Sequence, residues 1–211
     1  MNQLINIAAK TMSVILYPLF IPTYGIILFC YAYAHAVTVP ALWAIIAIIG
    51  TFVFTCVLPI TAIWLMMRSG QVKDLYIDNP RERTMPYIYS ACGFAFWAYL
   101  MVSVLHAPLS IGCVAIGATI AIGLVALINL WWKVSAHLAG IGGLLGGLLC
   151  YYLGIGVFPS WALIGPWLVL SLLLMYARVH LNAHTPAQVC VGWLLGLACT
   201  FLPYVIYCYV A

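Results

Sequence analysis

Long apolar runs that no charged residue interrupts are the feature that most constrains this chain. Of its 211 residues, 67% are hydrophobic and only 5% are charged. A soluble domain carries about a quarter charged residues, so this chain has too little polar side chain to cover a water-exposed surface. Disorder is excluded as well, because disordered segments need low hydrophobicity. A nucleic-acid binder is disfavoured, since the net charge of +4 comes from scattered residues and not from a basic face.

Seven segments are long enough to cross a bilayer, since a spanning helix needs about 20 apolar residues. A transmembrane β-barrel would instead show alternating strands of about ten residues. The sequence therefore predicts an all-α fold, a polytopic transmembrane bundle of six to seven helices that forms a single integral membrane domain over residues 1–211. The predicted spans cover roughly residues 12–34, 40–67, 87–106, 109–132, 134–154, 160–177 and 186–210.

The charged residues all fall on one side of a seven-helix bundle. They lie at Lys10, within 68–83, at Lys133 and at Arg178, and two predicted crossings separate each group from the next. Three of the five histidines, which are His137, His180 and His184, share that side. One interpretation is the positive-inside rule, by which Lys and Arg mark cytoplasmic loops. The other is a polar site assembled from several loops, which the histidines and acids favour.

The segment before the last span combines several groups suited to an anion. Thr185 suits a helix N-cap, and Gln188 falls three residues later, as in a capping box. His184 would precede a helix N-terminus, where free amide donors and partial positive charge attract anions. Arg178 supplies a planar fork that matches phosphate oxygens. An imidazole in this setting could act as a nucleophile toward phosphorus.

A second polar segment precedes the fifth predicted span. His137 could serve there as general acid to a leaving oxygen, and Ser135 could donate a further hydrogen bond. Small residues four apart let helices approach closely. Such residues follow His137 as two pairs, Gly142 with Gly146 and Gly143 with Gly147.

The remaining segment, residues 73–86, is the only strongly charged stretch. We expect its cations to neutralise a phosphate and its acids to hold those cations in an empty site. The cations are Lys73, Arg81 and Arg83, and the acids are Asp74, Asp78 and Glu82. Pro80 and Pro86 predict a backbone that does not continue as a regular helix.

Taken together, the three segments resemble the type 2 phosphatidic acid phosphatases, which are membrane-embedded lipid phosphatases. Their signature is Lys, six residues, then Arg-Pro; Pro-Ser-Gly-His; and Ser-Arg, five residues, His, three residues, Asp. Arg178 and His184 match the third part, with Ala177 at the Ser position and Gln188 at the Asp position. Ser135 and His137 match the second part, and Lys73 and Arg81 correspond to the first with one extra residue between them. The phosphatase-like part covers about residues 68–200.

The resemblance implies hydrolysis of a lipid phosphate or diphosphate through a phosphohistidine. It makes His184 the nucleophile, His137 the general acid, and Arg178 with Lys73 and Arg81 or Arg83 the phosphate clamp. It implies no metal and no cofactor. The expected partners are a phosphorylated lipid substrate and membrane lipids, and not nucleic acid. The expected location is the bacterial inner (cytoplasmic) membrane.

Gln188 leaves the activity open. A carboxylate at that position would orient and charge the histidine, whereas an amide only orients it. The chain is then a slow enzyme, or one in which Asp78 or Glu82 supplies the acid, or a non-catalytic lipid-phosphate binder or transporter. A plainer alternative is a small transporter or assembly subunit in which these residues only orient helices. The positive-inside rule puts the charged end in the cytoplasm, whereas many members of the family face the outer side.

Overall fold

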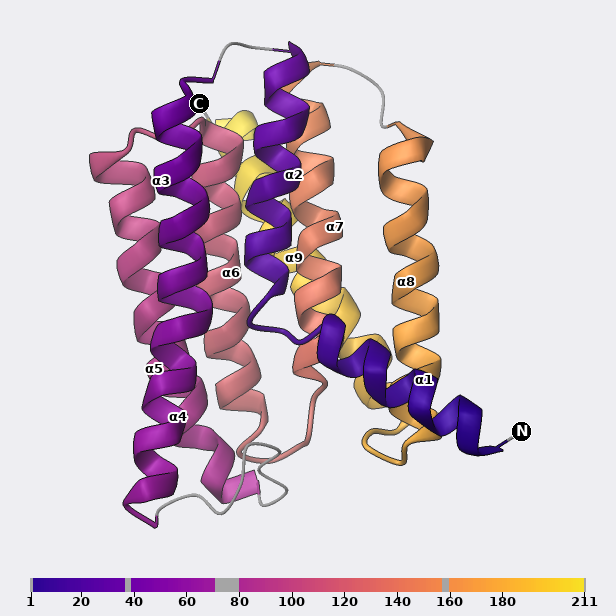
Figure 1. The fold of residues 1–211 in the computed structure, drawn as a ribbon. Helices are drawn as coiled ribbons and strands as arrows, with labels where there is room; N and C mark the ends of the chain where they lie inside the picture. Colours follow the sequence, from indigo (N-terminus) through magenta and orange to yellow (C-terminus); the bar gives the residue numbers. More distant parts are fainter. Residues whose placement is uncertain (1, 37–38, 71–79, 157–159, 211) are drawn as a thin grey trace.

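The computed structural model describes residues 2–36, 39–70, 80–156 and 160–210, without the side chains at positions 2, 34–36 and 80–83. All regular structure in these ranges is helical (Figure 1). The helices are α1 Asn2–Ile15, α2 Ile21–Ala36, α3 Ala41–Phe52, η1 Val53–Val57, α4 Leu58–Arg68, α5 Pro80–Tyr99, η2 Leu100–Val104, α6 Leu109–Ile128, α7 Ala136–Ile155, α8 Trp161–His180 and α9 Pro186–Val210.

The described helices form a membrane-type bundle, which confirms the predicted fold class. Six continuous helical stretches are long and apolar enough to cross a membrane, and α2 is a shorter apolar helix beside them. The α3, η1 and α4 elements form one such stretch, Ala41–Arg68. Figure 1 shows the ends of α4, α6 and α8 and the starts of α7 and α9 at the same end of the bundle.

The predicted first span over residues 12–34 is wrong, because the chain turns in its middle. Helix α1 ends at Ile15, and α2 begins only at Ile21. Pro18 lies in the turn, where its ring disfavours helical backbone at the preceding Tyr17. The Phe20 N–H donates to the Tyr17 carbonyl at 2.9 Å and closes the turn. As a result α1 leaves the bundle axis instead of extending α2 (Figure 1).

The expectation that Pro80 and Pro86 exclude regular helix is also wrong. Helix α5 starts at Pro80, where a missing N–H is harmless because the first helical N–H groups have no partner within the helix. Pro86 lies inside the helix and removes only one backbone bond. Its carbonyl accepts the Ser90 hydroxyl at 2.8 Å.

Helix α7 is the centre of the bundle and packs most closely on α9. Its Gly142 and Gly146 lie where an added Cβ would meet backbone atoms of Trp193 and Leu197 in α9. From the other side, a Cβ at Gly196 of α9 would meet the Ala139 carbonyl. The close approach predicted from the glycine spacing is confirmed. It places the N-terminal ends of α7 and α9, and therefore the second and third polar segments, side by side.

Candidate functional site

One large cavity, of about 910 Å³, opens among the described helices and contains both candidate imidazoles. His137, Arg178 and His184 all line it, although at least 40 residues of chain separate His137 from the other two. Arg178 and His184 are also close enough to His137 to act on its ring electrostatically. The sequence-based expectation that these three side chains converge is therefore met.

The turn between α8 and α9 brings Arg178 and His184 together. The Arg178 carbonyl accepts two backbone N–H groups, from Ala183 at 3.1 Å and from His184 at 3.3 Å. Asn182 has a left-handed backbone with φ of 53°, a conformation that asparagine tolerates better than most residues. The five residues between the arginine and the histidine thus fold back on themselves, so that both side chains reach the same cavity.

The predicted capping box at the start of α9 is present and extends to the histidine. The Gln188 N–H donates to the Thr185 hydroxyl at 3.4 Å, and the Gln188 Oε1 accepts the Thr185 N–H at 3.1 Å. The same Oε1 lies 3.2 Å from His184 Nδ1. Because the Thr185 N–H can only donate, the amide must present its oxygen here. When the His184 ring is neutral, its proton is therefore on Nδ1 and its lone pair on Nε2.

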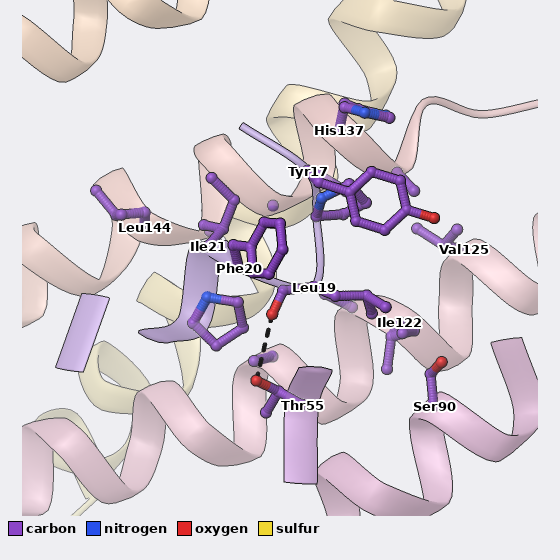
Figure 2. Close-up of a pocket in the computed structure, with 18 of the residues that line it drawn as sticks. Tyr17, Leu19, Phe20, Ile21, Thr55, Ser90, Ile122, Val125, His137 and Leu144 are labelled. Atoms are coloured by element: carbon purple, nitrogen blue, oxygen red, sulfur yellow. Dashed lines mark hydrogen bonds between the residues drawn. The ribbon is translucent and has the colours of Figure 1, made fainter. Parts of the chain in front are cut away.

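His137 is held by the N-terminal part of the chain. Its Nε2–H donates to the Ser13 carbonyl of α1 at 3.1 Å. The Tyr17 ring packs edge-on against the imidazole, with 5.5 Å between ring centroids and 89° between planes. Figure 2 shows Tyr17 and His137 together on one side of the cavity, and Thr55 bonded to the Leu19 carbonyl on another. The second nitrogen of His137, Nδ1, is thus the one left for chemistry.

Two lysines outside the predicted phosphate clamp also line the cavity. They are Lys10 of α1 and Lys133, just before α7. With Arg178 they place three cationic side chains on the cavity wall, and no carboxylate belongs to the described part of that wall. Lys133 lies four residues before His137 in the chain, but no spacing in the sequence connects Lys10 with the site. The charge balance of the described wall favours an anion.

Two predicted site residues that the structure describes, Ser135 and Gln188, do not line the cavity. Ser135 is fully buried, its hydroxyl has no hydrogen-bond partner, and a Cβ at Gly192 would press against its carbonyl. The expected bond from Ser135 to phosphate stays a prediction. Gln188 contacts His184 Nδ1 and does not itself line the cavity. Lys73 falls outside the described residues, as do the side chains of Arg81 and Arg83 and the acids Asp74, Asp78 and Glu82.

His180, the third histidine on this side, does not line the cavity. Its Nε2 bonds to the Asn6 side-chain oxygen of α1 at 2.8 Å, and its ring stacks on Tyr176. It therefore joins α8 to α1 and takes no part in the cavity wall.

The cavity continues from the charged end deep into the bundle. Val125 and Ile111 of α6 both line it, and the fourteen helical steps from one to the other correspond to about 21 Å. Phe29, Trp97 and Met101 line its far part. The cavity is thus cationic at one end and apolar along most of its length.

No family model matches the chain, and comparisons with curated proteins and with solved structures find no match either. Among the described residues, no three His, Cys, Asp or Glu side chains gather as a metal site would require. The expectations of metal and cofactor independence remain predictions.

Proposed function

We propose that this protein is a lipid phosphatase of the type 2 phosphatidic acid phosphatase kind, hydrolysing a lipid phosphate or diphosphate through a phosphohistidine. One observation carries the proposal. Two imidazoles and three cationic side chains from distant parts of the chain line one cavity whose remainder is mostly apolar. A phosphorylated lipid matches this cavity, because its anionic head suits the cationic end and its tail suits the apolar part.

His184 is the nucleophile in this proposal. Its Nε2 lone pair attacks phosphorus, and the bond between phosphorus and the lipid oxygen breaks. Gln188 supports the step by keeping the Nδ1 proton in place, since its Oε1 already accepts from that nitrogen and from Thr185. Water then attacks the phosphorus of the phosphohistidine and gives a proton to His137 Nδ1. The bond between phosphorus and His184 Nε2 breaks, which releases inorganic phosphate and returns His184 to its starting state.

His137 is the general acid. Its Nε2–H is held by the Ser13 carbonyl, so Nδ1 is the nitrogen that takes a proton from the singly protonated phosphate group and passes it to the leaving lipid oxygen. Arg178, Lys133 and Lys10 hold the phosphate oxygens and oppose their negative charge. The apolar length of the cavity receives the lipid tail.

The test is phosphate release by the purified protein in detergent, with a chelator present. Phosphatidic acid, phosphatidylglycerol phosphate and a polyprenyl diphosphate are the substrates to compare. We expect turnover, and we expect His184→Gln to lower it by about 10³-fold or more because the covalent step is lost. Labelled phosphate should be trapped on the native chain and not on the variant.

His180→Gln is the matched control, because His180 lies in the same segment but outside the cavity and a glutamine can still donate to Asn6. Its activity should stay near that of the native chain. Activity that disappears with the chelator, or that survives His184→Gln, would contradict the mechanism.

A second candidate function is non-catalytic binding or transport of a phosphorylated lipid, and the neutral Gln188 favours it. This function predicts binding of lipid phosphate that depends on Arg178 and is accompanied by no phosphate release. Equilibrium binding measured beside the turnover assay separates the two functions.

The proposed location is a bacterial cytoplasmic membrane, with the cationic end at one membrane surface. An introduced cysteine at position 160, at the start of α8, reports the opposite surface. Labelling it in whole cells with an impermeant reagent decides which surface carries the site.

A further inference from the structure

Helix α1 exposes an apolar stripe that no other described helix covers. Leu4, Ile7, Val14 and Ile15 are 73%, 55%, 56% and 56% exposed. With Ala8 and Thr11 between them, they recur at spacings of three and four residues, which is one face of an α-helix. Large apolar side chains gathered on one face mark a surface that contacts something other than water.

The other two faces of α1 have different partners. Ala9 and Ser13 are buried, and Leu16, which directly follows the helix, packs with Leu138 in the bundle core. Gln3, Asn6 and Lys10 form a separate exposed polar stripe. The helix therefore packs on the protein with one face and presents an apolar and a polar face outward.

Two contacts show that α1 runs along the end of the bundle. Asn6 bonds to His180, the last residue of α8, and the Ser13 carbonyl bonds to His137, the second residue of α7. Both partners lie at the same end of spanning helices, so the two ends of α1 lie at a similar depth. Fourteen residues also reach only about 21 Å, short of the roughly 30 Å hydrocarbon layer.

We propose that α1 lies in the plane of the membrane, with its apolar stripe in the leaflet next to the cationic end of the cavity. The lipid leaflet is the occupant because the stripe continues a surface that already faces lipid. On α8, against which α1 packs, Leu172, Leu173 and Tyr176 are exposed on a membrane-spanning helix. An apolar face beside a polar face carrying a lysine is typical of helices that lie at the headgroup boundary.

This placement gives the leaflet a part in building the site. Lys10 lines the cavity from the polar face of α1, and the Ser13 carbonyl holds His137 from its packed face. Anchoring the apolar stripe in lipid fixes both groups at the depth where a lipid headgroup lies. The inference concerns the position of α1 and holds whether or not the site hydrolyses anything.

Spin labels along α1 test the proposal in lipid nanodiscs without any substrate. Single cysteines are placed at positions 3 to 15 in a chain whose exposed Cys92, Cys190 and Cys208 are changed to serine. We expect collisions with oxygen, which dissolves in lipid, to peak at positions 4, 7 and 14. Collisions with a water-soluble nickel chelate should peak at positions 3, 6 and 10, in opposite phase and with a 3.6-residue period.

Three results would overturn the proposal. They are equal nickel exposure of both stripes, oxygen exposure that rises steadily along the helix as in a spanning segment, and stripe labels that neither reagent reaches because another protein covers them. A label at Leu172 of α8, exposed on a spanning helix, is the positive control for lipid contact. Gel filtration of each labelled chain shows that it is folded, so that every result bears on the proposal.

Discussion

At the scale of single residues, the Gln188 amide shows what an oxygen at this position does and what a charge would add. Its Oε1 accepts from both His184 and Thr185, so it fixes the ring tautomer as a carboxylate would. It carries no negative charge to stabilise the positive ring that forms when Nε2 attacks phosphorus. Gln188 thus orients the His184 ring but does not stabilise its positive charge.

Replacing Gln188 with glutamate isolates that contribution. Glutamate has the same length and is also a capping-box residue, so the geometry at Thr185 should persist. We expect turnover of lipid phosphate to rise, by up to about 10⁴-fold if the acid-to-amide change in serine proteases is a guide. Gln188→Ala, which removes both bonds of the oxygen, should lower turnover. Equal turnover in the native and glutamate chains would show that charge at this position is irrelevant.

Arg178→Lys tests the phosphate clamp. Lysine keeps the charge but loses the planar fork that binds two phosphate oxygens at once. A hydrogen bond to a charged group contributes about 1.5–3 kcal/mol, so we expect KM for a lipid phosphate to rise roughly tenfold or more. Arg68→Lys is the control, because Arg68 stacks on Trp64 at 4.2 Å and does not line the cavity. An unchanged KM in Arg178→Lys would remove Arg178 from the clamp.

The site residues that could be predicted are those that lie close to one another in the sequence at a recognisable spacing. Arg178, His184 and the capping box lie within a few residues of one another, and His137 belongs to a second short segment. Lys10 could not be found in this way, because only the packing of α1 on the end of the bundle brings it to the cavity. The position of Ser135 also depends on packing, because α9 covers it and keeps it out of the described cavity wall.

At the scale of elements, the contact of α7 with α9 sets the distance between the two histidines. Gly196→Ala should therefore act on both stability and site geometry. Its new Cβ would meet the Ala139 carbonyl and backbone atoms of Gly143, which are rigid. Overpacking costs about 1–3 kcal/mol, so we expect a lower melting temperature in detergent and weaker lipid-phosphate binding.

Gly123→Ala in α6 is the matched control, because an added Cβ there meets nothing within 4 Å. It should leave the melting temperature unchanged or raise it slightly. Alanine is more favourable than glycine inside a helix by roughly 0.5–1 kcal/mol. Equal melting temperatures of the Gly196→Ala and Gly123→Ala variants would mean that the α7–α9 contact tolerates an extra methyl group.

The elements that the sequence located best are the long, uninterrupted ones, such as α6 and α7. The errors lie at prolines, where hydropathy gives no information about backbone direction. The sequence stays apolar through Pro18 and therefore predicts one span. In the structure the backbone turns there, and α1 does not continue along the axis of α2. At Pro80 the opposite holds, because a proline at a helix start is compatible with the helix that follows.

At the scale of the whole molecule, the cavity predicts a dependence on tail length. Gly25 lines it, and a Cβ at that position would meet nothing within 4 Å. Gly25→Leu should therefore put side-chain atoms into the apolar part. We expect kcat/KM for a long-chain lipid phosphate to fall by roughly 5- to 150-fold, from a steric cost of about 1–3 kcal/mol.

A short, water-soluble phosphate ester is the internal reference for that measurement, because it fills only the cationic end. Its kcat/KM should change little in Gly25→Leu. The Gly123→Leu variant should leave kcat/KM unchanged for both substrates. A parallel loss for short and long substrates in Gly25→Leu would mean that the tail does not enter this part of the cavity.

The bond between His137 and Ser13 joins residues 124 positions apart. A ribosome therefore releases α1 long before the α7 imidazole that it holds, and α9 with its capping glutamine comes later still. Partly synthesised chains carry Lys10 without Arg178 or His184 and so have no assembled anion pocket. The pocket is therefore assembled only after α9 has been synthesised, and not when the early helices insert.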